Sequence, residues 1–511
     1  MQTGKVYLVG AGPGDPGLLT IKAQKCLEKA DIVIYDYLAN EQLLEYVNPE
    51  AECVYVGKKA GRHTMKQHEI NKFLVESARK YTCVVRLKGG DPFLFGRGGE
   101  EALELLKNNI CFEVVPGVSA GLAVPAYAGI PVTHRELASS VAFITGHEAQ
   151  KARNSASVDW KRIADSCDTL VIYMGVKNLP NIAHDLISAG LSENTPVAMI
   201  REGTYNTQQT VTGTLHTIAR HAQEHNMTPP AIIVVGNVVT LHEQLAWFEN
   251  RPLFGKTVVI TRNKTSEAKF SALLQHQGAN IFHFPTIDIA EILPNKKLET
   301  ALSNLNQYDW LLFTSGNAVR IFFERLFEQG NDMRSLHTIK IAVNGKPSAE
   351  KLREYYLKAD FIPDLFTSEE LVAGMLSKFS LAGTKILFPG STLSNPSIAE
   401  TLKNSGASVD VIPVYETKVA TVDQNIVEDL KSRVRDRKID WISFTSSSTV
   451  ENFVEIVGSD FLAEQKQNIP VASIGPVTTQ SLEKHEFQPL VTAGEHTFAG
   501  LVDSLIQGTK P

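Results

Sequence analysis

Cysteine is scarce in this sequence and unevenly placed. The chain of 511 residues holds five cysteines, none of them follows Cys167, and no two form a C-x-x-C pair. This spacing suggests neither a disulfide framework nor a zinc site, and it favours a reducing compartment. Long apolar runs are lacking too: none reaches about 18 residues, and the run at 6–9 is too short for a signal-peptide core. We therefore expect a cytoplasmic protein without a membrane partner.

The chain also lacks an excess of positive charge. It has 50 Lys and Arg against 56 Asp and Glu, a formal net charge of −6. A negative chain has no global attraction for nucleic acid or anionic membranes, so a polyanionic ligand would need local basic clusters. The composition, 43% hydrophobic and 21% charged, is that of a globular enzyme. The length corresponds to about three or four compact units.

Short β-branched runs alternate with amphipathic segments throughout, which predicts an α/β fold. The strands predicted in the first half are 5–10, 32–35, 84–87, 141–145, 169–174 and 231–236. In several of these runs, polar residues do not alternate with the apolar ones. We therefore expect interior strands that are covered on both faces and largely parallel. The pattern pauses at residues 247–256, where we place a domain boundary.

The second half contains an internal repeat. Residues 309–315 (DWLLFTS) recur as 440–446 (DWISFTS), and the openings at 255–259 and 383–387 also match loosely. Two similar α/β lobes are the simplest explanation. A cleft between paired lobes is a usual place for a ligand.

Two loops in the first half suggest a cofactor site. The first runs Gly10-Ala11-Gly12-Pro13-Gly14-Asp15 after a predicted strand. In the dinucleotide fingerprint G-x-G-x-x-G the third glycine would fall on Asp15, which would repel a pyrophosphate, so that interpretation fails. A tight turn that needs positive φ stays open as a purely structural explanation. The second loop, Gly89-Gly90-Asp91, suits a ligand with ribose hydroxyls and an amino-acid group better than one with phosphates.

These loops resemble those of the uroporphyrinogen III C-methyltransferases, in the tetrapyrrole methylase family. The resemblance spans roughly residues 4–245 and includes the motifs at 35–36, 57–63, 67–71, 116–120, 128–135 and 145–147. It implies a two-lobed methylase fold over residues 1–248 and S-adenosylmethionine as cofactor. The cofactor-binding residues that it implies are Pro13, Gly89, Gly90, Asp91, Leu94, Ser119, Ala120, Met174, Gly203, Pro230 and Ala231.

The same resemblance implies that Asp36 is the general base and Lys58 the proton donor. By position alone, Asp36 could instead cap a helix after a strand, and Lys58 could be a solvated surface charge. The implied substrate is a polycarboxylate, so its pocket should be basic. Cations expected on loops beside the glycine motifs, which could also form a solvated face, are Lys58, Lys59, Arg62, His63, Lys88, Arg97, His134 and Arg135.

Residues 255–511 resemble uroporphyrinogen III synthase, through the segments 314–319, 363–371, 413–415, 444–450 and 474–478. The resemblance implies two flavodoxin-like lobes, one made of 255–287 plus 416–511 and the other of 288–415. Their connections should fall near 284–289 and 412–417. It implies that Tyr415 assists loss of the substrate hydroxyl, although a plain interfacial tyrosine is an alternative. The substrate-binding residues, each of which could instead cap or pack a helix, would be Thr314, Ser315, Thr445, Ser446 and Thr478.

Together the two resemblances imply a bifunctional enzyme. It would cyclise hydroxymethylbilane to uroporphyrinogen III and methylate that product twice, giving precorrin-2 for cobalamin or siroheme. No metal and no nucleic acid would be needed, and a homodimer through the methylase domain is expected. Two alternatives stay open: a methylase of the same fold acting on a later corrin or on RNA, and a second half that only binds a ligand.

Overall fold

A computed structural model describes residues 3–57, 65–146, 158–262, 264–364 and 368–509. The chain forms two compact units: residues 1–256 with 274–280, and residues 257–273 with 281–511. Each unit contains two five-stranded sheets with helices on both faces. The predicted α/β class is therefore confirmed. In the described parts of the chain, no helix combines the length and apolar character needed to cross a membrane.

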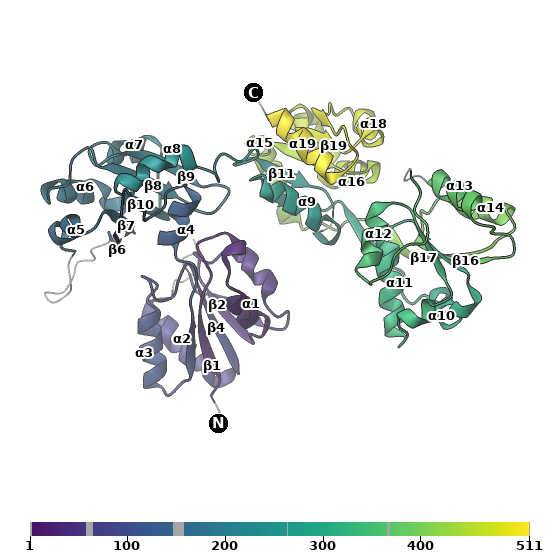
Figure 1. The fold of residues 1–511 in the computed structure, drawn as a ribbon, viewed down its shortest axis with the longest axis horizontal. Helices are drawn as coiled ribbons and strands as arrows, with labels where there is room; N and C mark the ends of the chain where they lie inside the picture. The colour runs from purple at the N-terminus through teal and green to yellow at the C-terminus, as the bar shows by residue number, and fades with distance from the viewer. Residues whose placement is uncertain (1–2, 58–64, 147–157, 263, 365–367, 510–511) are drawn as a thin grey trace. The chain divides into compact units, whose positions relative to one another are not determined.

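The first sheet has the strand order β3-β2-β4-β1-β5, and all its pairs are parallel. Its strands are β1 (Lys5–Gly10), β2 (Ile32–Tyr35), β3 (Glu52–Tyr55), β4 (Cys83–Lys88) and β5 (Phe112–Val115). One face packs on α2 (Gln67–Lys80) and α3 (Gly98–Lys107), the other on α1 (Ile21–Glu28) (Figure 1). Both faces are buried, as the uninterrupted apolar runs predict. The carboxyl ends of all five strands consequently meet at one edge.

The second sheet has the order β6-β7-β10-β8-β9. Its strands are β6 (Val141–Thr145), β7 (Thr169–Tyr173), β8 (Pro196–Arg201), β9 (Gln209–Thr214) and β10 (Ala231–Val235). Only β6 and β7 pair in parallel; the other three pairs are antiparallel. The prediction of largely parallel strands is wrong here, because an antiparallel sheet covered on both faces produces the same apolar runs. Its helices are α4 (Ala120–Tyr127), α5 (Trp160–Ser166), α6 (Leu179–Ser188), α7 (Ile218–Glu224) and α8 (His242–Leu245).

The sheets of the second unit exchange strands between the two sequence repeats. One sheet has the order β12-β11-β18-β19-β20 and the other β13-β17-β16-β14-β15. The opening strand of the first repeat, β11 (Thr257–Ile260), pairs with β18 (Trp441–Phe444) of the second. The opening strand of the second repeat, β16 (Lys385–Ser391), pairs with β14 (Trp310–Phe313) of the first. Repeat and lobe are thus offset by one strand.

Two chain segments pass between these lobes. After β12 (Asn280–His283) the chain enters β13 (Ile287–Glu291), which pairs antiparallel with the end of the long strand β17 (Ser408–Val419).

The other strands of the second unit are β15 (Lys340–Val343), β19 (Val471–Ser473) and β20 (Val491–Thr492). The helices of the lobe containing β14 are α10 (Lys296–Ser303), α11 (Gly316–Glu328), α12 (Lys346–Arg353), α13 (Ser368–Lys378) and α14 (Pro396–Asn404). Those of the lobe containing β18 are α9 (Lys264–His276), α15 (Gln424–Arg435), α16 (Ser447–Val457), α17 (Ser459–Gln465), α18 (Pro476–Lys484) and α19 (Phe498–Thr509).

Candidate active sites

The loops that leave β1, β4 and β5 meet at the carboxyl edge of the first sheet. A Cβ added to Gly117 would lie 2.3 Å from the Gly90 carbonyl oxygen and 2.7 Å from the Gly10 Cα. Gly12 and Gly90 also exchange backbone hydrogen bonds, with N–O distances of 3.2 and 2.7 Å. Since no side chain fits between these loops, backbone groups line this edge, where ligands of parallel sheets usually bind.

Asp91 holds two of these loops together. One carboxylate oxygen accepts hydrogen bonds from the backbone N–H of Phe93 at 2.8 Å and of Leu94 at 3.1 Å. The other oxygen accepts from the N–H of Gly117 at 3.1 Å. Asp91 can therefore accept from a ligand only through lone pairs that these bonds leave over.

Ser119 and Ala120 lie where the chain enters α4 of the second lobe. The Ser119 hydroxyl is 2.6 Å from the Tyr173 hydroxyl, which also accepts from the Gly121 N–H at 2.6 Å. Burial raises the pKa of Tyr173, so its hydroxyl stays protonated and can donate in return. These contacts hold the start of α4 against the end of β7.

The other predicted cofactor residues of the second lobe lie at strand ends. Met174 follows β7, and Gly203 packs so tightly that an added Cβ would lie 2.3 Å from Val124 Cγ1. Pro230 precedes β10, which begins at Ala231, and its carbonyl accepts from the Glu202 N–H at 3.1 Å. Strained non-glycine residues gather in these loops and in the one after β4, as is common at functional sites. Those with positive φ are Phe95, Arg97, Met174, Glu202 and Thr204.

Three contacts bring the two sets of loops together. The Asp15 N–H donates to Thr204 Oγ1 at 2.9 Å, and the Tyr127 hydroxyl donates to Asp15 Oδ2 at 2.7 Å. The rings of Phe95 and Tyr173 lie 5.0 Å apart. The predicted cofactor residues of both lobes are therefore neighbours in space, although they come from distant parts of the sequence.

Asp36 follows β2 at the same edge. Its Oδ2 accepts from Arg86 Nη2 at 2.7 Å, its Oδ1 accepts from the Leu38 N–H at 3.2 Å, and 22% of its side chain is exposed. The alternative in which Asp36 caps a helix is wrong. The following short helix is capped by Asn40, whose side chain accepts from the Gln42 N–H. The carboxylate of Asp36 is thus fixed in orientation but open to the edge of the sheet.

The predicted basic residues lie in different environments. Lys58, Lys59, Arg62 and His63 lie outside the described residues. Arg97 is exposed and forms a bidentate ion pair with Glu100, at 2.9 and 2.6 Å. His134 is half-buried and Arg135 is exposed.

The placement of Lys88 on a loop is wrong. It is the last residue of β4, only 6% of its side chain is exposed, and its Nζ lies 2.9 Å from Glu101 Oε1. Burial lowers its pKa, and Arg86 adds to this effect. A lysine held in this way is not available to a substrate at the surface.

In the second unit, hydroxyl residues stand where helices begin. Ser315 caps α11 by accepting from the Ala318 N–H at 3.1 Å, and Ser446 caps α16 by accepting from the Thr449 N–H at 3.4 Å. The capping alternative is thus correct for both, and it does not exclude a second partner. Thr314 is half-buried beside Ser315.

Thr445 is half-buried like Thr314, whereas Thr478 is buried. Thr445 Oγ1 is buried without a hydrogen-bond partner among the described residues. Thr478 is buried within α18. A buried hydroxyl without a partner is costly, which makes the Thr445 hydroxyl available to a ligand or water.

Tyr415 lies where β17 passes between the lobes. Only 7% of it is exposed, and its hydroxyl lies 2.9 Å from Ser315 Oγ. In the sheet, Tyr415 is aligned with Glu291 of β13. The hydroxyl of Tyr415 is therefore held at the amino end of α11.

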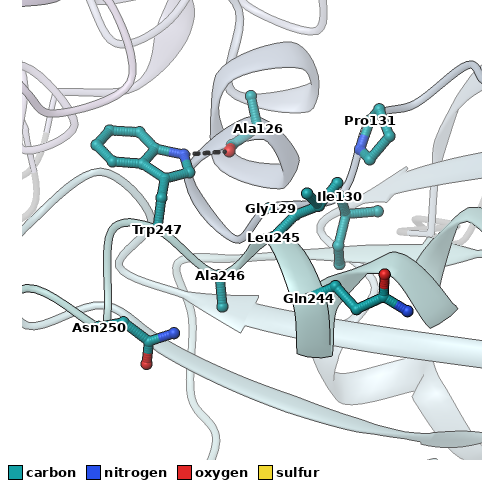
Figure 2. Close-up of a pocket in the computed structure, with 9 residues that line it drawn as sticks. All are labelled: Ala126, Gly129, Ile130, Pro131, Gln244, Leu245, Ala246, Trp247 and Asn250. Atoms are coloured by element: carbon teal, nitrogen blue, oxygen red, sulfur yellow. Dashed lines mark hydrogen bonds between the residues drawn. The ribbon is translucent and has the colours of Figure 1, made fainter.

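A cavity of about 540 Å³ lies elsewhere in the first unit (Figure 2). It is bounded by the end of α4, the following turn and residues 244–250, and the Trp247 indole N–H donates to the Ala126 carbonyl at 3.0 Å. None of the predicted site residues lines this cavity. In the described part of the chain, no three His, Cys, Asp or Glu side chains are grouped as metal ligands.

Arg86 and Glu101 are residues near Asp36 that the sequence analysis missed. Arg86 occupies the middle of a strand that is otherwise apolar up to Lys88. A charged residue inside such a run was the available signal, because a charge is buried only when a partner neutralises it.

Comparison with known proteins supports the two-part architecture. The family of Tetrapyrrole (Corrin/Porphyrin) Methylases matches residues 5–219, and the family Uroporphyrinogen-III synthase HemD matches residues 268–503. The porphyrin biosynthesis protein HemD of Ruminiclostridium josui is 36% identical over 507 residues, which cover 99% of this chain and 98% of that protein. A uroporphyrinogen-III C-methyltransferase of Bacillus subtilis is 53% identical over 247 residues, covering 48% of this chain and 95% of that protein.

A uroporphyrin-III C-methyl transferase of Thermus thermophilus, solved with S-adenyl homocysteine, is 40% identical. The match covers 47% of this chain and 100% of that one, with a TM-score of 0.40.

The fold and the sites define a fused pair of α/β enzymes, each with its own candidate site. The chain belongs to the family of the porphyrin biosynthesis protein HemD. In this chain the tetrapyrrole methylase match precedes the uroporphyrinogen-III synthase match. Both resemblances found in the sequence are thereby confirmed.

Proposed function

We propose that residues 1–248 transfer two methyl groups from S-adenosylmethionine to uroporphyrinogen III, giving precorrin-2 for cobalamin or siroheme. Residues 255–511 supply that substrate by cyclising hydroxymethylbilane, with one lobe formed by 255–287 and 416–511 and the other by 288–415. The observation that carries the proposal is the meeting of the Gly10, Gly90 and Gly117 loops with Asp36 at one sheet edge. This edge occurs in a chain whose second half belongs to the synthase family.

The residues at this edge suit S-adenosylmethionine. The described loops that meet there present bare backbone and the carboxylates of Asp15 and Asp91. Carboxylates favour a ligand with a cationic sulfonium and an ammonium group over one with phosphates. The residues that would hold it are Pro13, Gly89, Gly90, Asp91, Leu94, Ser119, Ala120, Met174, Gly203, Pro230 and Ala231.

In the methylase, the sulfonium of the cofactor supplies an activated methyl group. Asp36 accepts a proton from the substrate after methyl transfer, and its two fixed hydrogen bonds hold it in one orientation for this step. Lys58 donates a proton. The carboxylates of the substrate bind to Lys59, Arg62, His63, Arg97, His134 and Arg135.

In the synthase, Tyr415 assists the departure of the substrate hydroxyl by donating its own proton, and Ser315 orients it. The remaining work is conformational, since a flexible polyanion must be folded until its ends react. The hydroxyls of Thr314, Ser315, Thr445, Ser446 and Thr478 bind its carboxylates.

The enzyme acts in the cytoplasm on small tetrapyrroles, as a homodimer through the methylase domain, without nucleic acid or membrane. The absence of a C-x-x-C pair and the net charge of −6 support this setting.

Incubation of the purified full chain with hydroxymethylbilane and labelled S-adenosylmethionine tests both activities. Doubly labelled precorrin-2 should form without any added enzyme. Hydroxymethylbilane alone should give the type III porphyrin after oxidation, whereas only the spontaneous type I isomer would refute the synthase. Uroporphyrinogen III supplied directly tests the methylase, and failure to label it would refute that activity. Labelling without type III product would favour a second half that only binds a ligand.

A further inference from the structure

Three buried charged side chains and the partly exposed Asp36 form a cluster at the carboxyl edge of the first sheet. Arg86 is 3% exposed, Glu101 of α3 is fully buried, and Lys88 is nearly so. Asp36, the fourth, is the most exposed of them. The cluster thus combines two basic and two acidic side chains.

Arg86 lies at the centre of this cluster. Its Nη2 donates to Asp36 Oδ2 at 2.7 Å and its Nε to Glu101 Oε1 at 3.3 Å. Its Nη1 donates to the backbone carbonyls of Leu87 and Ile34, at 2.9 and 3.3 Å. All three nitrogens of the guanidinium are thus engaged, and the group has one available position.

Glu101 fixes the far end of the cluster. Its Oε1 accepts from Arg86, from Lys88 Nζ at 2.9 Å and from Gln67 Nε2 at 3.2 Å. These donors come from β4 and from the first turn of α2. The contacts join the sheet to both helices on this face and lead, through Arg86, to Asp36.

Stability alone is a weak reason for such a cluster. A protein in which apolar residues of similar volume replace a buried ion network is often as stable as the original or more stable, because charges lose their hydration on burial. The neighbouring position on the same face of β4, Val84, is apolar and completely buried. Apolar residues are therefore tolerated on this face, and the charges appear only where the strand approaches Asp36.

We propose that Arg86 is a positioning residue for methyl transfer: anchored by Glu101, it holds the Asp36 carboxylate in one orientation, aimed at the substrate. The inference rests on the proposed role of Asp36 as proton acceptor. Arg86 itself is only 3% exposed, too little to bind substrate, so it acts through Asp36. A lysine would not replace it, since an ammonium lacks the planar fork that serves Asp36, Glu101 and two carbonyls together.

The test uses the full chain with uroporphyrinogen III and labelled S-adenosylmethionine. Arg86→Ala should lower kcat by roughly tenfold to a thousandfold, the range of a displaced general base, with little change in KM for the cofactor. Millimolar guanidinium or ethylguanidinium should restore part of kcat, because the small cation can occupy the vacated position. Ammonium at the same concentration should not.

Arg86→Lys is the variant to use if Arg86→Ala does not fold. It keeps a basic side chain at this position, and its kcat should be much lower than that of the wild type. Affinity for S-adenosylhomocysteine, measured by calorimetry, should stay within about threefold in either folded variant. The control is Glu101→Gln, which keeps the Arg86–Asp36 contact and should lose thermal stability but less of kcat than Arg86→Lys.

Two results overturn the inference. One is a folded Arg86 variant with wild-type kcat while Asp36→Asn is slow. The other is loss of kcat and cofactor affinity in parallel, without rescue, as a merely structural residue would give. Failure of the wild-type chain to methylate uroporphyrinogen III would instead refute the proposed function itself.

Discussion

The substitution Gly117→Ala tests the geometry of the cofactor edge directly. The added Cβ would lie 2.3 Å from the Gly90 carbonyl oxygen and 2.7 and 2.9 Å from the Gly10 Cα and carbonyl carbon. All three contacts are with backbone, so no side chain can rotate away to relieve them. At least one of the loops after β1, β4 and β5 must therefore move.

Overpacking of this kind costs about 1–3 kcal/mol. For a unit of this size that corresponds to a fall in Tm of about 3–10 °C. Because the displaced backbone forms the proposed cofactor site, affinity for S-adenosylhomocysteine should fall roughly tenfold to a hundredfold, about 1.4 kcal/mol for each factor of ten. Calorimetric titration and thermal unfolding measure the two effects.

Gly99→Ala is the matched control. Gly99 lies in the first turn of α3, and no heavy atom lies within 4 Å of an added Cβ. Alanine there should leave binding unchanged and raise stability by up to about 1 kcal/mol. If Gly117→Ala has the same affinity for S-adenosylhomocysteine and the same Tm as the wild type, the close approach of the loops is refuted. The cofactor site built on that approach is then refuted too.

Three further predictions concern single side chains. Asp36→Asn should slow methylation by about 10²- to 10⁴-fold while calorimetry shows unchanged affinity for S-adenosylhomocysteine, and near-wild-type turnover would remove Asp36 from the mechanism. Tyr415→Phe should slow formation of the type III isomer from hydroxymethylbilane by at least about tenfold without altering methylation of added uroporphyrinogen III; an unchanged isomer ratio by chromatography would argue against its role. Burial and the hydrogen bond to Asp15 raise the pKa of Tyr127 above its ordinary value of 10, so its contribution to stability is present below pH 10 and is lost as the pH rises further. The Tm of the wild type should accordingly fall more steeply above pH 10 than that of Tyr127→Phe, and parallel curves would contradict this.

Local patterns in the sequence predicted six of the ten strands that form the two sheets of the first unit. The runs at 5–10, 32–35 and 141–145 have the bounds of β1, β2 and β6. The direction of pairing in the second sheet could not be predicted in this way, because burial on both faces makes parallel and antiparallel strands alike in sequence. Strands β3, β5, β8 and β9 were not predicted; in β9, the alternating threonines and Gly213 leave no apolar run.

The candidate sites were predictable where a motif marks them and not where partners come from separate elements. The glycine loops stand out because close backbone approach permits only glycine. The pairing of Arg86 with Asp36 and Glu101, in contrast, joins the interior of one strand to the end of another and to a helix. Lys88 was misjudged because a cation beside a glycine motif looks solvated until the helix that covers it is known.

The exchange of strands in the second unit also constrains how the protein is made. The sheet of β11 and β12 is completed only by β18, β19 and β20, so its first strands must wait while more than a hundred intervening residues are synthesised. The methylase sheets contain no strand from beyond β10, and domains fold as units during synthesis, the first one first. A ribosome stalled after the methylase would thus carry two complete sheets. A chain stalled before β18 would expose an unpaired strand edge, which can bind chaperones or pair with other chains in aggregates.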